Sequence, residues 1–315
     1  MRATLARGVA VLLAGAAVLA AATCKKAAPP PAEGGGAAAP NVKAAVAAGR
    51  FYPGDADELR RAVRGYLDAA TPEGAPAGVV AVFTPHAGYE YSGLIAAAAY
   101  CQLGDRKPDT FVILAPSHHY GPEAGIAAPT YDGFATPLGT VPVDRALVEA
   151  VTAACPAVSA ADAPFEAEHA VEVQLPFIQV LAPGAAVAPF VFCRQDEEAA
   201  TAFGHALAKA IRERGGDVVI VCTCDLSHYH PYDEARALDG EFVRTFKTFD
   251  AAAVTAAVAA ARTEIDAPGP VVAAFTAARD LGAEKTLVLA QRNSGDVTGD
   301  ASAGVVGYFA GAAVK

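Results

Sequence analysis

Three apolar segments of the 315-residue sequence each run directly into a turn that carries histidine. Each segment with the polar residues of its turn is as follows: 79–83 with His86, 110–115 with His118 and His119, and 218–223 with Asp225, His228 and His230. Continuous apolar runs of this length are typical of buried strands in a parallel sheet. Because the carboxyl ends of neighbouring parallel strands meet at one crevice, we expect these imidazoles and the carboxylate to lie close together.

Such a cluster can serve in three ways. Its nitrogen and oxygen atoms can ligate a divalent metal ion, or they can divide acid and base roles. The third alternative is a hydrogen-bonded histidine cluster without chemistry. His169, in EAEHAVEVQLP, is a further candidate for the crevice, and His205, in FGHALAKAI, is expected on a helix surface. We expect His119, His230 and Tyr229 to be supporting neighbours.

The elements that must position these residues alternate along the chain from Gly49 onward. This order predicts one α/β domain with a mostly parallel sheet flanked by helices. Hydrophobic periodicity predicts helices that include 55–70, 94–103 and 168–181, the last bent or broken at Pro176.

A glycine-rich loop, QRNSGDVTGD, follows a predicted strand near the C-terminus. Its Asp296 or Asp300 could turn a carboxylate into the crevice. The alternative is a tight turn with solvated aspartates, and the sequence favours neither.

Charge and motifs exclude several classes of function. The chain has 34 acidic and 24 basic residues and no Lys/Arg-rich run, which argues against nucleic acid as a partner. It has no glycine-rich nucleotide-binding motif and no G-x-S-x-G elbow. The cysteines beyond Cys24 form no C-x-x-C pair, so we expect buried thiols instead of a disulfide scaffold.

The N-terminal residues 1–24 have the three parts of an export signal: Arg2 and Arg7, an apolar run and a small-residue stretch. Cys24 follows directly and suggests lipidation, as in a bacterial lipoprotein. Plain cleavage after Ala22 and a retained membrane anchor are the alternatives. Residues 25–40 read as a disordered Pro/Gly/Ala tether, and 41–315 as the folded domain. We therefore expect export from a bacterial cytoplasm, to a periplasmic location or to a membrane held only through the lipid.

Six motifs occur in an order that resembles the Memo family, whose bacterial members are called AmmeMemoRadiSam system protein B. They are GRFYPGDADEL, PHAGYEYSG, LAPSHHYG, EHAVEVQLPF, DLSHY and NSGDVTGD, and the resemblance covers residues 44–312. It implies a fold similar to the class III extradiol (LigB-like) dioxygenases, which have a non-haem iron site.

By this resemblance, His86 and His118 match two metal ligands, and His228 matches an acid/base histidine with Asp225 beside it. Asp225 and His228 are also candidate ligands. His169 and Glu172 match the family motif EH-x-x-E-x-x-LP, which implies that they line or brace the crevice, with His169 a further candidate catalytic residue.

Two positions depart from the family pattern. Gly295 stands at the place expected for a third ligand, so that Asp296, Asp225 or His228 would have to supply it. Asp266 and Ala267 stand where the family usually shows a Cys-Gly pair, so any role of that cysteine is lost.

The resemblance implies a metal-dependent redox or dioxygenase-like enzyme. Fe(II) is the expected ion, with copper or zinc as alternatives. The competing hypothesis is a non-catalytic metal- or peptide-binding protein anchored outside the cytoplasm. The small-molecule or peptide ligand is not identified by the sequence.

Overall fold

The computed structural model describes residues 39–70 and 76–315. The predicted signal, Cys24 and nearly all of the tether therefore lie outside the described residues. The residues from Pro40 to Lys315 form one compact unit. No helix within the described ranges is long and apolar enough to cross a membrane.

The centre of the main sheet is parallel, as the apolar runs predict. It consists, in spatial order, of β2 (Val79–Thr84), β9 (Val218–Thr223), β3 (Thr110–Pro116) and β8 (Ala186–Phe192). Nearly every residue of these strands is buried, because helices cover both faces. The histidine-bearing turns after β2, β3 and β9 consequently meet at one edge.

The outer strands make the sheet mixed. On one side β12 (Val305–Val314) runs antiparallel to β2 and carries β10 (His228–His230) and β11 (Lys285–Asn293). On the other side β4 (Ile126–Ala128) is antiparallel to β8 and parallel to β7 (Val158–Ala160). A small separate sheet consists of β1 (Val42–Lys43), β5 (Gly133–Thr136) and β6 (Gly139–Pro142).

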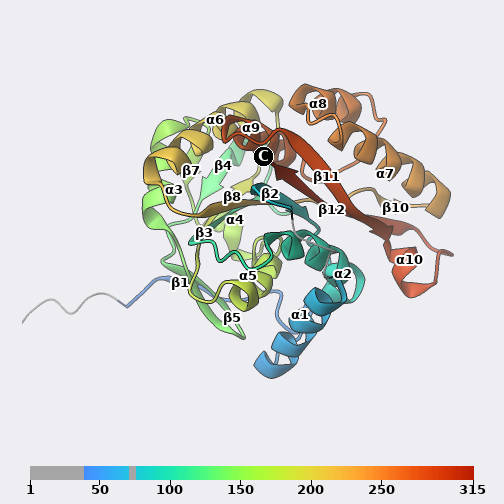
Figure 1. Cartoon of the computed structure of the whole chain (residues 1–315), viewed down its shortest axis with the longest axis horizontal. Coiled ribbons are helices and arrows are strands. Elements are labelled where there is room, and N and C mark those ends of the chain that lie inside the picture. The colour runs from blue at the N-terminus through green and yellow to red at the C-terminus, as the bar shows by residue number, and fades with distance from the viewer. Residues whose placement is uncertain (1–38, 71–75) are drawn as a thin grey trace, which may run out of the picture. The chain divides into compact units, whose positions relative to one another are not determined.

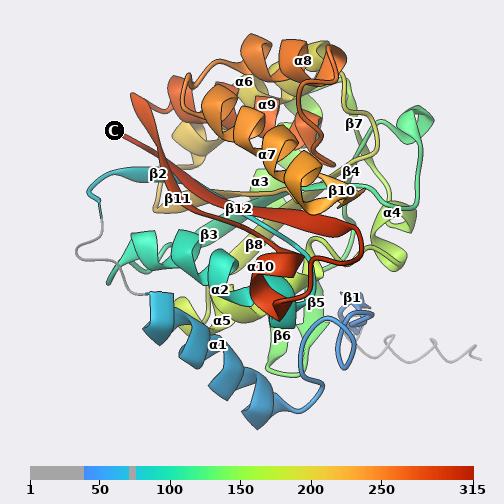
Figure 2. The ribbon, with the colours of Figure 1, turned by 90° about the vertical axis from the view of Figure 1, so that its right-hand side faces the viewer.

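Helices cover the two faces of the main sheet (Figures 1 and 2). One face carries α3 (Arg145–Ala154), α6 (Glu197–Arg214), α7 (Tyr232–Phe246), α8 (Ala251–Ala259) and α9 (Pro268–Asp280). The other carries α1 (Ala56–Ala70), α2 (Tyr89–Tyr100) and α5 (Leu175–Leu181). Two short helices, α4 (Ala163–Glu166) and α10 (Ser294–Thr298), lie at the ends of loops.

The predicted helix over 168–181 is wrong in its first half. A 3-10 turn covers Glu172–Gln174, and the α-helix begins only at Leu175. Pro176 does not bend a helix interior. It lies in the first turn, where its missing N–H is not needed. His169 therefore lies in irregular backbone, which leaves it free to approach the strand ends.

Candidate metal centre

His86, in the turn after β2, is held by the end of β9 and the turn that follows it. Its backbone N–H donates to Asp225 Oδ1 at 2.9 Å, and its ring Nδ1 lies 2.9 Å from Thr223 Oγ1. Gln174 Nε2 donates to the same hydroxyl at 3.1 Å. The side chain is almost fully buried, so these contacts fix the ring and leave Nε2 directed at the crevice.

His118 is held by a buried carboxylate, Glu168. Its backbone N–H donates to Glu168 Oε2 at 2.8 Å, and its Nδ1 lies 2.9 Å from Oε1. The same carboxylate accepts from the backbone N–H groups of His169 and Ala170, both at 2.9 Å. A carboxylate on one ring nitrogen is how metal-binding histidines are commonly oriented, with the other nitrogen left for the ion.

The third side chain of the centre is Asp266, which lies just before α9. Its Oδ1 accepts from the backbone N–H of Asp225 at 3.0 Å, and its own N–H donates to the Asp225 carbonyl at 3.3 Å. Its Oδ2 lies 2.8 Å from His86 Nε2 and 3.7 Å from His118 Nε2. Each of the three side chains is thus anchored through one polar atom and presents the other to a common point.

Two of the presented atoms are buried without a hydrogen bond among the described residues: His86 Nε2 and Asp266 Oδ2. They are 2.8 Å apart, but their directions do not meet hydrogen-bond geometry. A buried polar atom without a partner is costly and rare. Two ligand atoms that share an ion, each about 2.1 Å from it, lie roughly 3 Å apart. The donor set therefore fits a metal ion better than it fits a hydrogen-bonded cluster.

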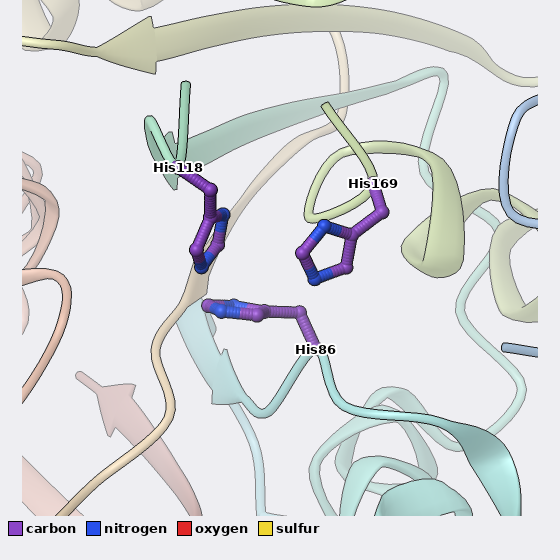
Figure 3. Close-up of side chains that lie close together, drawn as sticks. All are labelled: His86, His118 and His169. Atoms are coloured by element: carbon purple, nitrogen blue, oxygen red, sulfur yellow. The ribbon is translucent and has the colours of Figure 1, made fainter. Parts of the chain in front are cut away.

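Two further side chains border the same point. Ligand atoms of His86, His118 and His169 lie within 4.8 Å of one another, and so do those of His86, Asp225 and Asp266. Figure 3 shows ring nitrogens of His118 and His169 directed toward the His86 ring. His169 also packs on Phe51, with ring centroids 4.3 Å apart. His86 thus belongs to both ligand groups, one with the imidazoles of His118 and His169 and one with the carboxylates of Asp225 and Asp266.

The charges of the centre are strongly coupled. Burial opposes a charged His86 ring, but the charges of Asp266 and Asp225 outweigh burial and raise its pKa. Burial likewise opposes charge on His118, and the carboxylates of Asp266 and Glu168 outweigh it, raising the pKa to about 10. The pKa of the Asp266 carboxyl is held well below its usual range, against burial, by the charges of His86 and His118.

The pKa values of two other groups, His169 and Asp225, are shifted in the direction that favours the uncharged form. Burial and the neighbouring His86 lower the pKa of His169 to about 3, so its ring is neutral at physiological pH. Burial raises the pKa of the Asp225 carboxyl. Without metal, the remaining pKa shifts favour protons on His86 and His118 beside the Asp266 and Glu168 carboxylates. A divalent cation can replace those protons.

The predicted residues do not all come together. His86, His118, His169 and Asp225 meet at the centre, whereas neither ligand group of the described residues includes His228. The His228 side chain is half-buried on β10, and its backbone N–H lies 3.3 Å from Glu264 Oε1.

The predicted supporting residues lie outside the ligand groups. His119 is exposed, with Nε2 3.1 Å from the Ala167 carbonyl. His230 contacts Glu264 and Glu234, at 2.7 and 3.2 Å. Both histidines therefore stabilise the surrounding turns and do not reach the centre.

Glu172 braces the fold and not the crevice. It is buried and accepts from the backbone N–H groups of Val46 and Ala47, both at 2.8 Å, and from Tyr52 Oη at 2.6 Å. Lys43 Nζ lies 3.3 Å from its Oε2. The carboxylate thus fastens the segment around β1 to the start of α5.

The loop that was one possible source of a third ligand forms α10. Asp296 completes a capping box with Asn293 and accepts from Tyr232 Oη at 2.6 Å. Gly295 is buried in this helix, where a Cβ would lie 3.0 Å from Val305 Cγ1. The structure brings neither residue to the centre. It brings Asp266, from the other position at which the sequence departs from the family pattern.

Sequence reasoning missed Glu168, Thr223 and Gln174 as well as Asp266. Glu168 gave a signal, because it stands directly before His169 and could reach backbone N–H groups of its own turn. Gln174 and Thr223 gave none, because a glutamine in a helix-like segment and a threonine at a strand end are common.

Comparison with known proteins finds similar sequences over nearly the whole described chain. Residues 43–312 match the family model described as Memo-like protein. A MEMO1 family protein of Methanothermobacter thermautotrophicus is 36% identical over 277 residues, covering 85% of this chain and 98% of the relative. A MEMO1 family protein of Aeropyrum pernix is also 36% identical, over 273 residues, covering 83% and 95%. A third, from Methanosarcina mazei, is 34% identical over 275 residues, covering 85% and 98%.

Proposed function

The chain belongs to the Memo family, and from this premise and the geometry of the centre we propose that it is an enzyme that holds one Fe(II) ion between His86, His118 and Asp266. The observation that carries the proposal is the 2.8 Å approach of His86 Nε2 to Asp266 Oδ2, both buried and neither hydrogen-bonded among the described residues.

The composition of the donor set favours iron. Two imidazoles and one carboxylate on one side of an ion are the ligand set of non-haem Fe(II) oxygenases, which leaves positions open for other ligands. Bound there, iron would supply redox chemistry and Lewis acidity. Zinc or copper could also bind to these three donors. Because the donor set favours iron, the activity test uses Fe(II).

Side chains around the ion have separate tasks. Asp225 Oδ2 lies 3.9 Å from His86 Nε2, and burial favours its protonated form, so it can hold a proton beside the ion. His228 is half-buried on β10, three positions after Asp225. In the proposal His228 passes that proton to solvent. His169, neutral because of its lowered pKa, orients a ligand or accepts a proton from it.

Oxygen consumption tests the enzymatic part of the proposal. The full chain is loaded with Fe(II) without oxygen and then mixed with oxygenated buffer and a panel of catechols. We expect catalytic oxygen uptake with at least one of them. We also expect His228→Gln to retain its iron but turn over about 100-fold more slowly, as for loss of an acid/base group. An iron-loaded protein that consumes no oxygen across the panel would contradict dioxygenase-like turnover.

A further inference from the structure

Asp266 contributes a carboxylate oxygen to the centre, at a position where the resemblance described above implies a cysteine. Here the carboxylate oxygen lies 2.8 Å from His86 Nε2, and the other oxygen is fixed by the Asp225 backbone N–H at 3.0 Å. Its side chain is 17% exposed, so water can compensate only part of its charge.

In the part of the chain that the structure describes, no cysteine thiolate takes the place of the cysteine implied at position 266. Cys224 follows β9, next to Asp225, but its thiol lies 3.2 Å from the Asp225 carbonyl, to which it can donate. Burial raises the pKa of this thiol well above its usual value. Neither ligand group among the described residues contains a cysteine. The donors of the centre are therefore imidazole nitrogens and carboxylate oxygens.

We propose that Asp266 makes the centre selective for the divalent cations Fe(II) and Mn(II) and against the soft monovalent Cu(I). This inference rests on the proposed function, since it assigns the selectivity of the same site. Thiolate and thioether donors favour Cu(I), whereas carboxylate oxygen favours hard cations.

Charge supports the same selectivity independently of donor softness. The Asp225 backbone N–H donates to Asp266 Oδ1, and the Asp266 backbone N–H donates to the Asp225 carbonyl. The two residues belong to one ligand group with His86. The Asp266 oxygen that faces His86 is buried. In such a site a carboxylate attracts a divalent ion more strongly than the monovalent Cu(I).

The test compares Asp266→Cys with the wild-type full chain. Affinities for Mn(II) and Cu(I) are measured without oxygen by competition with chromophoric chelators. We expect the ratio of Cu(I) to Mn(II) affinity to rise by about tenfold or more in Asp266→Cys. Asp266→Glu, which keeps the carboxylate, should leave the ratio near the wild-type value. His118→Ala serves as the control and should lower the affinity for both ions.

A Co(II) spectrum gives a readout that does not depend on affinity. Asp266→Cys loaded with Co(II) should show a thiolate-to-cobalt charge-transfer band that the wild type lacks. Co(II) bound without this band would place residue 266 away from the ion and overturn the inference, as would an unchanged affinity ratio. A wild-type chain that binds no Mn(II), Fe(II) or Co(II) would instead refute the proposed function. If Asp266→Cys does not fold, Asp266→Asn decides: it must lose more affinity for Mn(II) than for Cu(I), and equal losses would overturn the inference.

Discussion

His86 Nε2 and Asp266 Oδ2 lie 2.8 Å apart, although 180 positions separate the two residues along the chain. His86 reaches this point from the turn after β2, and Asp266 from the turn before α9. Both side chains are anchored through their other polar atom, to Thr223 and to the Asp225 backbone. The fold therefore holds an imidazole and a carboxylate together without letting them satisfy each other, which is the arrangement a metal ion requires.

Glu168 should control metal affinity through His118. Glu168→Gln removes the negative charge beside the His118 ring and keeps only one acceptor oxygen. Three of the four contacting groups face Oε1 and the His118 backbone N–H faces Oε2, so the NH₂ group leaves at least one N–H without its acceptor. We expect about a 10- to 100-fold loss in Mn(II) affinity, measured by chelator competition.

The matched control for this change is Asp280→Asn. Asp280 Oδ2 lies 2.7 Å from His205 Nδ1, a more exposed histidine–carboxylate pair between α6 and the C-terminal end of α9. This substitution should leave metal affinity unchanged. Equal losses in the two variants would show that Glu168 acts on general stability and not on the centre.

Glu172 should matter for stability and not for metal binding. Glu172→Gln leaves the Lys43 ammonium buried without its charge partner, which we expect to cost about 3 kcal/mol of unfolding free energy in urea denaturation. Glu149→Gln, at an exposed ion pair with Arg145, should cost less than about 1 kcal/mol. Loss of metal binding by folded Glu172→Gln would mean that this brace also shapes the centre.

Asp239 should make stability depend on pH. Burial raises its pKa from 3.8 to about 6, against the hydrogen bond from the Ser227 backbone N–H. A carboxyl whose pKa is higher in the folded than in the unfolded state stabilises the folded protein most below about pH 4. This contribution to the unfolding free energy is lost as the pH rises through about 6. Relative to Asp239→Asn, the wild type should lose on the order of 2 to 3 kcal/mol between pH 4 and 7. Urea unfolding at several pH values measures this, and parallel curves for the two proteins would contradict the prediction.

Cys24 should determine where the protein is found. The sequence of residues 1–24 supports a lipidated N-terminus, and these residues lie outside the described structure. Expressed in a bacterium with a lipoprotein pathway, the wild type should partition with membranes and Cys24→Ala should not. Equal partitioning of both into a soluble periplasmic fraction would favour plain cleavage.

The strand ends of the centre could be predicted from sequence because one local pattern specifies each of them. An apolar run such as 79–83 predicts a buried strand, and the parallel arrangement then brings His86 and His118 together. The helical periodicity of 168–181 misled, because buried residues of an irregular segment mimic the spacing of a helix face.

Asp266 could not be placed in the same way. In the sequence it lies between α8 and α9, and it does not follow a strand. Its position depends on two tertiary contacts with the Asp225 backbone, which no local pattern encodes. The resemblance marked position 266 as a departure, but only the three-dimensional arrangement brings its carboxylate to the centre. At Gly295 the resemblance implied a third ligand, but that segment forms α10 and its Asn293 and Asp296 cap this helix.

The most direct test of the account is metal content by elemental analysis after anaerobic loading with Fe(II) and removal of free ion. We predict one iron per wild-type chain, and loss of most of it in each of His86→Ala, His118→Ala and Asp266→Ala. His205→Ala, outside the centre, should retain one iron per chain. A wild-type chain that retains no iron, or an Asp266→Ala variant that binds it as tightly as the wild type, would contradict the proposed centre.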